Sequence, residues 1–506
     1  MTSATVLAID QGTSGTKALM VCPERGIIGS GYAGVRPRYG AGGSVEQDPM
    51  ELLRSVLDAG RRAIAAAGEP VAAVGLANQG ETVLAWDPVT GEPLTDAVVW
   101  QDRRAQPVCD ELAGEAERLA RLSGLPLDPY FAAPKMAWLR RNLTREGVVT
   151  TSDAWLVHRL TGAFVTDAST ASRTMLLDLD RTEWSPEALE TFGLRDERLP
   201  EVVDASGAFG ETGAFTEAGG SGALGSSGVA SAGGSGPAVP LTGLLVDQQA
   251  ALLAQGCLEA GTAKCTYGTG AFLLANAGHQ AVRSSAGLAA CVAWRLAGRP
   301  TYCLDGQVYT VASAVRWLTD LGVIGGADDL DRLGGSVPDA GGVTFVPAFA
   351  GLAAPSWRGG VRASLTGLGL DITPAHIVRA LCDGIAAQVV ELAGAMAGDL
   401  GRTPSVLRAD GGLTRSKVLM QTQADLLQAP VEVYASPDAT ALGVAAAARM
   451  GLDPSLQVAD ATVQGPPSAV YEPRVSADEA AHRLGAYAAA VRALLADTGP
   501  KTEENR

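Results

Sequence analysis

Residues Ile9 to Met20, "IDQGTSGTKALM", place a carboxylate, glycines and hydroxyls in one turn between two apolar runs. Glycines let backbone N–H groups approach anionic oxygens closely, and the hydroxyls of Thr13 and Ser14 add further donors. The turn differs from G-x-x-x-x-G-K-[ST], and the chain has no Gly-Lys pair, which excludes a P-loop. The segment therefore predicts a phosphate-binding turn of another kind, with a plain hairpin turn as the alternative.

A similar unit recurs in the second half of the chain. "TAKCTYGTGAFLLAN" (Thr262 to Asn276) again places a Gly/Thr turn between two apolar runs. A third glycine turn, "VLRADGGLTRS" (Val406 to Ser416), follows a short predicted strand and precedes a predicted helix. Two halves with the same strand–turn–strand unit predict duplicated domains that face each other across a cleft.

Asp247 is a second candidate for chemistry. It lies in "TGLLVDQQAALLAQG", where an apolar run delivers a carboxylate to a predicted strand end and a helix begins behind it. An Asp directly before a helix is also a common N-cap. The pattern alone leaves both roles open.

The predicted elements around these residues mix strands and helices. The first fifty residues alternate apolar runs with Gly-rich turns, as antiparallel strands do. A helix is predicted in "DPMELLRSVLDAGRRAI", where Asp48 can cap, Pro49 suits the first helical position and Glu51 completes a capping box. A strand, Val71 to Ala77, follows this helix. The first half is therefore predicted to be α/β.

Residues 210–236 are rich in Gly, Ser and Ala without periodicity, so we expect a flexible surface insertion. The insertion contains a formal G-x-G-x-x-G, at Gly220, Gly222 and Gly225. No strand precedes this match and no helix pattern follows it, so a dinucleotide site is not expected.

The length of 506 residues predicts two domains of about 250 residues each, because one compact core rarely extends further. We place them at residues 1–249 and 250–506. In the second, Thr373 and Pro374 begin a predicted helix, and the Ala-rich tail after Asp460 is predicted to be largely helical.

Composition narrows the functional classes. The formal net charge of −16 would repel nucleic acid and anionic membranes, so neither is an expected partner. The start of the chain has no basic region before its apolar run, and no segment approaches eighteen uninterrupted apolar residues. Seven cysteines without a C-x-x-C spacing fit reduced thiols. These features predict a soluble, cytoplasmic protein.

Taken together, the motifs resemble the FGGY family of carbohydrate kinases, and within it the glycerol kinases. The resemblance runs from about Val6 to about Met450 and is carried, in order, by "DQGTSGT", "VEQDPME", "ANQGET", "VVWQDRR", "DPYF..PK..W", "ASRTML", "VDQQAALL", "TYGTGAF", "VPAF.GLAAP", "ADGGLTRS" and "ATALGVAAAA". It implies an α/β fold of two ribonuclease-H-like domains of the actin-like ATPase type. ATP and the acceptor would lie between the domains.

On the nucleotide side, the resemblance implies that "DQGTSGT" and "TYGTG" contact the phosphates of ATP and that "ADGG" flanks the adenosine. The matched positions are Thr13, Ser14, Gly15, Lys17, Thr269, Ala312, Arg316, Gly412 and Ser416. At Ala312, Arg316 and Ser416 this chain departs from the glycine, glutamine and asparagine typical of glycerol kinases. Asp10 is expected to hold Mg²⁺ directly or through water, since carboxylate oxygen suits that hard cation.

On the acceptor side, the resemblance makes Asp247 the general base that takes the proton of the attacking hydroxyl. An alcohol is a poor nucleophile at neutral pH, which is why such a base is needed. The implied acceptor pocket comprises Gly80, Glu81, Trp100, Tyr130, Asp247 and Gln248.

Gly80 is the most informative departure, since glycerol kinases have an arginine there ("NQRET"). Losing that charge-assisted donor should weaken glycerol binding by about 1.5–3 kcal/mol. It should also empty a volume the size of an arginine side chain, which favours a longer acceptor such as a four- or five-carbon polyol. Alternatively Arg103, Arg104 or water fills the gap and glycerol is the acceptor. Ala132, where the family pattern has Ser, Thr or Pro, is a lesser departure.

The sequence thus predicts an ATP-dependent kinase that phosphorylates a primary hydroxyl of a small polyol or sugar. A ketose kinase of the same family, of the xylulose or ribulose type, is one alternative. An actin-like ATPase that phosphorylates nothing is another, although it would need no acceptor motifs. The four histidines show no ligand spacing, so a metal hydrolase is not expected. A homo-oligomer is as compatible with the sequence as a monomer.

Overall fold

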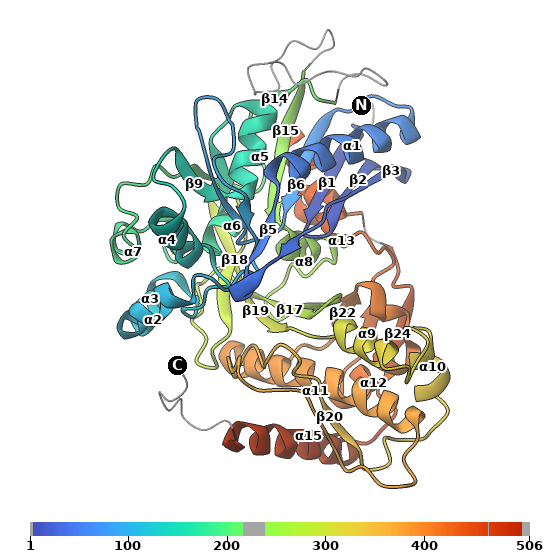
Figure 1. The fold of residues 1–506 in the computed structure, drawn as a ribbon. Helices are drawn as coiled ribbons and strands as arrows, with labels where there is room; N and C mark the ends of the chain where they lie inside the picture. Colours follow the sequence, from blue (N-terminus) through green and yellow to red (C-terminus); the bar gives the residue numbers. More distant parts are fainter. Residues whose placement is uncertain (1–3, 216–237, 464, 498–506) are drawn as a thin grey trace.

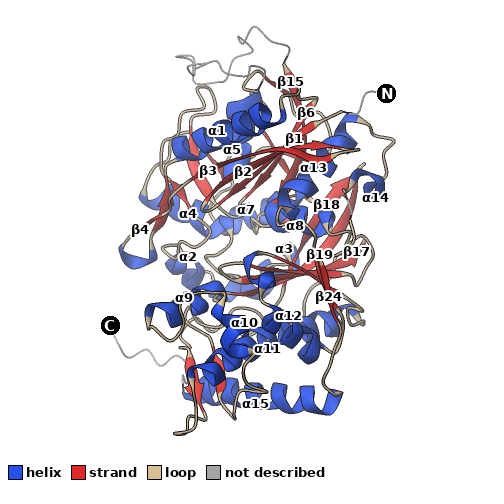
Figure 2. Cartoon of the chain, turned by 90° about the vertical axis from the view of Figure 1, so that its right-hand side faces the viewer, coloured by secondary structure: helices blue, strands red, loops and turns tan. Residues whose placement is uncertain are grey.

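The computed structural model describes residues 4–215, 238–463 and 465–497. Two large sheets lie one above the other, each with helices packed against it (Figures 1 and 2). The strands that carry the predicted phosphate turns belong to different sheets.

The first sheet holds the N-terminal strands in the order β14-β15-β6-β1-β2-β3. β1, β2 and β3 are antiparallel neighbours, whereas β6 and β15 run parallel to β1. The bounds are β1 (Val6–Gly12), β2 (Gly15–Cys22), β3 (Gly26–Gly34), β6 (Ala73–Asn78), β14 (Glu211–Thr212) and β15 (Val239–Val246).

The second sheet repeats this arrangement in the order β18-β19-β17-β16-β22-β23-β24. β16, β17 and β19 are antiparallel neighbours, and β22 and β23 continue parallel to β16. The bounds are β16 (Ala263–Tyr267), β17 (Ala271–Gly278), β18 (Ala289–Leu296), β19 (Arg299–Val308), β22 (Leu407–Asp410), β23 (Val431–Val433) and β24 (Ala469–Tyr471). The expected pair of ribonuclease-H-like α/β units is therefore confirmed.

Smaller sheets attach to these two. A five-stranded sheet has the order β4-β5-β8-β7-β9, and three pairs join β10 with β13, β11 with β12 and β20 with β21. The bounds are β4 (Arg38–Tyr39), β5 (Val45–Gln47), β7 (Val83–Trp86), β8 (Ala97–Val98), β9 (Val148–Thr151), β10 (Val165–Asp167), β11 (Leu177–Asp178), β12 (Glu183–Trp184), β13 (Glu201–Val203), β20 (Thr344–Val346) and β21 (Ser364–Thr366).

Helices cover the sheets and fill the loops between strands. Their bounds are α1 (Pro49–Ala67), α2 (Gln106–Glu111), α3 (Ala116–Ser123), α4 (Ala132–Asn142), α5 (Ser152–Thr161), α6 (Ala168–Ser172), α7 (Pro186–Thr191), α8 (Asp247–Ala254), α9 (Ala312–Asp320), α10 (Asp329–Gly334), α11 (Pro374–Leu400), α12 (Lys417–Leu427), α13 (Ala439–Leu452), α14 (Val458–Ala461) and α15 (Ala477–Asp497). Three short 3₁₀ helices are η1 (Ala41–Gly43), η2 (Ala113–Glu115) and η3 (Gly412–Arg415).

The local signals in the sequence account for most helix starts. Asp48 caps α1 by accepting from the Met50 amide at 2.8 Å, although Glu51 does not complete a capping box. α11 begins at Pro374 behind the Thr373 cap, as expected. α11 is also the one described helix long and apolar enough to cross a membrane, and two thirds of its apolar window is buried, so it is a core helix.

The start of the Gly/Ser-rich segment is not the flexible surface insertion that we expected. Residues 211–212 form β14, which pairs with β15, and Phe215 is buried against Gly60 of α1. The ordered start follows from these apolar contacts, because a phenylalanine that packs into the core fixes its own backbone. The formal G-x-G-x-x-G match lies outside the described residues.

One late helix crosses from the second half of the chain to the first sheet. α13 lies beside β1, β6, β15 and α8 (Figure 1). Its close approach depends on glycines: a Cβ at Gly75 of β6 would lie 2.7 Å from the Val444 carbonyl oxygen, and one at Gly443 would overlap the Ala250 carbonyl. Because α8 begins at Asp247, this packing fixes the position of that residue.

We expect Gly443→Ala to destabilise the protein by about 1–3 kcal/mol, since the added methyl must displace the backbone of α8. Gly394→Ala on α11 is the matched control, because nothing lies within 4 Å of a Cβ there. It should leave the free energy of unfolding unchanged or raise it by up to about 1 kcal/mol. Urea unfolding of both variants tests this, and equal midpoints would contradict the packing described for α13.

Candidate active site

Three adjacent parallel strands of the first sheet end at the same edge, and each end carries a predicted site residue. Asp10 lies near the end of β1, Glu81 follows β6, and Asp247 follows β15. In register, Asp10 is opposite Ala77 of β6, and Asn78 of β6 is opposite Val246 of β15. The structure thus brings together three carboxylates that lie far apart in the sequence.

Asp247 is half-buried at the first turn of α8. Its Oδ1 accepts from the backbone N–H of Gln248 at 2.7 Å, and α8 has no side-chain cap at its N-terminus. Burial raises the pKa of Asp247, and the nearby Lys264 and Arg173 offset part of this rise. The structure therefore does not use Asp247 as an N-cap of the usual kind.

The charge of Asp10 is incompletely compensated. Burial, together with the negative charges of Asp247 and Asp438, raises the pKa of Asp10 to about 7, and Lys17 counteracts this only in part. Among the described residues no three His, Cys, Asp or Glu side chains lie close enough to hold a metal alone. The residues fit Mg²⁺ in its usual manner, with one or two carboxylates and the remaining ligands from water and phosphate.

The turn between β1 and β2 has the form predicted for a phosphate turn, with Thr13 and Ser14 at its tip. Thr13 Oγ1 accepts from Trp100 Nε1 at 2.9 Å, and Ser14 is exposed. Gly15 is required, because a Cβ there would lie 2.7 Å from the backbone carbonyl oxygen of Ala33. Lys17, the basic residue that follows this turn, forms an ion pair with Asp438.

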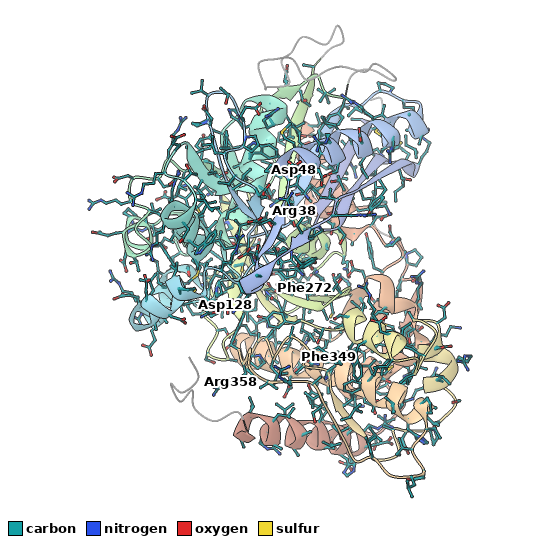
Figure 3. The ribbon with its side chains drawn as sticks, in the orientation of Figure 1. Arg38, Asp48, Asp128, Phe272, Phe349 and Arg358 are labelled. Atoms are coloured by element: carbon teal, nitrogen blue, oxygen red, sulfur yellow. The ribbon has the colours of Figure 1, made fainter. Side chains whose placement is uncertain are left out.

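Aromatic side chains gather beside these carboxylates. Trp100 packs edge-on against Tyr130, with ring centroids 5.7 Å apart, and against Phe272, at 6.4 Å. Phe272 lies on β17 of the second sheet, in the middle of the molecule (Figure 3). The group offers flat apolar faces next to polar groups, which suits a small carbon chain that bears hydroxyls.

A buried lysine holds the loop of Tyr130 in place. The amine of Lys135, at the start of α4, donates to the carbonyls of Pro129 at 2.9 Å and Phe131 at 2.7 Å, and also to that of Tyr130. Burial lowers the pKa of Lys135 to about 7, and the charge of Glu81 counteracts this. Ala132, the departure noted above, is buried as the first residue of α4.

Glu81 is buried in a left-handed backbone conformation, with φ of +58°, which a non-glycine residue seldom adopts. Its Oε1 accepts from Nε of Arg173 in an ion pair. Burial raises the pKa of Glu81, and Arg173 opposes the rise. Arg173, from the motif "ASRTML", had no role in the sequence-based prediction.

One side chain, that of Val246, lies close to Gly80. A Cβ at position 80 would lie 3.0 Å from Cγ2 of Val246, so a valine methyl fills part of the space. The two arginines that could compensate for Gly80, Arg103 and Arg104, are both engaged in ion pairs. Arg103 pairs with Asp128 at 2.7 Å, and Arg104 pairs with Asp102 at 2.7 Å and Glu46 at 2.8 Å.

The remaining residues matched to the nucleotide side belong to the second sheet and its neighbours. Thr269 is exposed at the tip of the β16–β17 turn, and its carbonyl accepts from the Val311 amide, directly before Ala312 and α9. Arg316 and Gly412 are exposed. The hydroxyl of Ser416 donates to Asp331 at 2.7 Å and caps α12.

A chain of polar side chains that the sequence did not reveal links the two sheets. The buried Lys264 donates to Oε1 of Gln248 at 2.6 Å and to Oγ1 of Thr266 at 2.9 Å. Thr266 in turn donates to Asp410 at 2.5 Å. Gln248 is thereby tied to the strand β16 that leads into the Thr269 turn.

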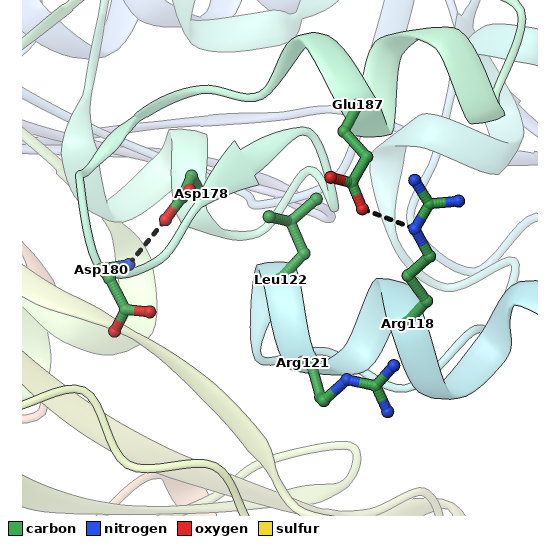
Figure 4. A pocket seen from close by; sticks show the side chains of 6 residues that line it. All are labelled: Arg118, Arg121, Leu122, Asp178, Asp180 and Glu187. Carbon is green, nitrogen blue, oxygen red and sulfur yellow. Dashed lines mark hydrogen bonds and ion pairs between the residues drawn. The ribbon is translucent and has the colours of Figure 1, made fainter.

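Two hollows elsewhere contain none of these residues. One, of about 400 Å³, is lined by side chains of α3, β11 and α7, including the Arg118–Glu187 pair at 2.6 Å (Figure 4). The other, of about 330 Å³, lies between α11, β20 and α15. The paired charges around the first are half-exposed, as in a solvated surface.

Comparison with known proteins agrees with the geometry. Residues 5–254 match the N-terminal domain of the FGGY family of carbohydrate kinases, and residues 263–452 match its C-terminal domain. The chain is 41% identical over 505 residues to a glycerol kinase from Alkalilimnicola ehrlichii, which covers 96% of this chain and 97% of the relative. It is also 41% identical to a glycerol kinase from Thermus brockianus, over 88% of this chain and 90% of the relative.

Solved structures show the same fold. A glycerol kinase from Plasmodium falciparum, crystallised with ADP, superposes with a TM-score of 0.87 at 29% identity, covering 97% of this chain and 98% of that one. A xylulose kinase from Lactobacillus acidophilus superposes with a TM-score of 0.85 over the same shares at 19% identity, which shows the fold alone. The chain belongs to the FGGY family of carbohydrate kinases and is a phosphotransferase with an alcohol group as acceptor.

Proposed function

We propose that the protein transfers the γ-phosphoryl group of ATP to a primary hydroxyl of a small polyol in the cytoplasm. The observation that supports this most is the meeting of Glu81 and Asp247 at neighbouring strand ends, beside Tyr130 and Trp100. An ATPase without an acceptor would need no such arrangement. The glycerol kinases at 41% identity and the relative crystallised with ADP support the same activity.

In this proposal Asp247 is the general base. Its carboxylate takes the proton of the acceptor hydroxyl as that oxygen forms a bond to the γ-phosphorus, and the bond to the β-phosphate oxygen breaks to leave ADP. A pKa raised by burial suits the task, because it makes the carboxylate a stronger base than an exposed one. Gln248, held by Lys264, would donate its amide hydrogens to the acceptor.

The phosphates would lie between the two glycine turns. Thr13, Ser14 and Thr269 supply hydroxyl and backbone donors there, and Asp10 would hold Mg²⁺. That ion would neutralise charge on the transferring phosphoryl group. We also propose the division into domains at residues 1–249 and 250–506, with α13 returning to the first.

The acceptor end favours a polyol longer than glycerol, such as erythritol. Gly80 offers no side-chain donor to a hydroxyl, and Val246 turns an apolar methyl toward that position. Glycine in place of arginine at position 80 would leave extra space for the acceptor. That space would be smaller than a whole arginine side chain, because Val246 takes part of it.

Asp247→Asn should lower kcat by about 10²- to 10⁴-fold, since the amide cannot take the proton. Its affinity for ADP should stay within a factor of about two, because the phosphate turns are untouched. Coupled ADP release and calorimetric ADP binding measure the two quantities. Asp196→Asn, at an exposed position, is the control. A kcat of the Asp247 variant close to wild type would rule out Asp247 as the base.

Wild-type ADP release should be faster with erythritol, threitol, xylitol or ribitol than with glycerol at equal, subsaturating concentrations. The double variant Gly80→Arg/Val246→Ala should shift kcat/KM toward glycerol by about 10- to 100-fold, because it restores a charged donor and makes room for it. Gly80→Arg alone should shift less. If the wild type prefers glycerol, another group compensates for the arginine that is missing at Gly80. If it prefers xylulose or ribulose, the enzyme is a ketose kinase.

A further inference from the structure

A short buried helix, α6, connects the strand ends that carry the site. Ser169 accepts from the Val246 amide at 3.0 Å, directly before Asp247, and Thr170 bonds Asn78 at 3.2 Å, at the end of β6. Ser172 accepts from the Val292 amide at 3.0 Å, which lies in β18 of the second sheet. These three polar contacts fix α6 against both sheets.

Arg173 follows directly after α6 and points its guanidinium into the acceptor end of the site. One nitrogen pairs with Glu81, and another pairs with Asp305 of β19 at 2.6 Å. Nη2 donates to the Tyr130 hydroxyl at 3.2 Å, and the guanidinium lies 5.6 Å from the centres of the Tyr130 and Phe131 rings. All these groups are buried, so the charge of Arg173 acts with little screening.

We propose that Arg173 is the positioning residue of the acceptor pocket: it holds the Glu81 carboxylate and the Tyr130 hydroxyl in place for the polyol. The inference rests on the proposed function of Glu81 and Tyr130 as acceptor-binding groups. Arg173 engages only Oε1 of Glu81 among the described residues, which leaves Oε2 to accept from a substrate hydroxyl. The rigid fork of the guanidinium is what allows one side chain to fix three partners.

The charges around Glu81 make its ionisation depend on Arg173. Arg173 and Lys135 of α4 favour the carboxylate, whereas burial and Asp247 of α8 oppose it. Removing Arg173 therefore raises the pKa of Glu81 further. A protonated Glu81 accepts fewer hydroxyl donors, so acceptor binding should weaken as the pH falls through the raised pKa.

The test compares Arg173→Gln with Arg173→Lys, with glycerol and erythritol as acceptors. In Arg173→Gln the acceptor KM should rise about 10- to 100-fold, and the acid limb of kcat/KM should move to higher pH by about one unit or more. In Arg173→Lys the charge remains but the fork is lost, so KM should rise while the acid limb stays near its wild-type position. The KM for ATP and the affinity for ADP should not change in either variant.

Arg295→Gln is the matched control, because this arginine is also largely buried and pairs with Asp204 at 2.6 Å, away from the site. It should lower Tm without moving the acceptor KM or the pH profile. A failure of Arg173→Gln to bind ADP would indicate misfolding. In that case the acceptor KM of Arg173→Lys tests the proposal. An unchanged acceptor KM in Arg173→Lys, or in a folded Arg173→Gln, would overturn the proposal. If the wild type phosphorylates neither compound nor any other polyol, the proposed function fails instead.

Discussion

The burial of like charges at one edge of the first sheet is the constraint on which the site depends. Asp10, Glu81 and Asp247 meet there because parallel strands end together, and Asp305 and Asp410 approach from the second sheet. Buried carboxylates are costly unless a cation compensates them. The cations that the chain supplies near these carboxylates are Lys17, Lys135, Arg173 and Lys264. Asp10 keeps the raised pKa of an incompletely balanced group, which a bound cation would stabilise.

Close backbone packing is the second requirement. Glycines at positions 75, 243 and 443 let α13 lie directly on β6, β15 and α8, with alanines filling the remaining contact. Larger side chains would hold the helix away and shift the strand ends that it supports. The motif "ATALGVAAAA" thus acts mainly through its lack of side-chain volume, and its Thr440 hydroxyl also donates to the Asp247 carbonyl at 3.4 Å.

The sequence predicted those parts of the site that sit beside local signals. Asp10 and Asp247 each follow an apolar run, and the Thr13 turn lies between two strands, so strand ends and turns could be placed from pattern alone. Pairing partners could not be placed. Arg173 contacts Glu81 across 92 positions and Asp305 across 132, and no periodicity records such contacts. The one available signal was a lone basic residue in an otherwise small and apolar stretch, "ASRTML".

The two sheets also show how a duplicated fold becomes asymmetric. The hairpins β1–β2 and β16–β17 are equivalent in the strand order, yet the strand before the turn presents Asp10 in the first and Thr266 in the second. Thr266 is neutral, and its hydroxyl bonds Lys264 and Asp410 of the same sheet. The first sheet leaves its carboxylate under-compensated. The two hairpins share their backbone geometry, but they differ in their side chains. The first sheet presents a carboxylate before its turn, and the second presents a neutral hydroxyl.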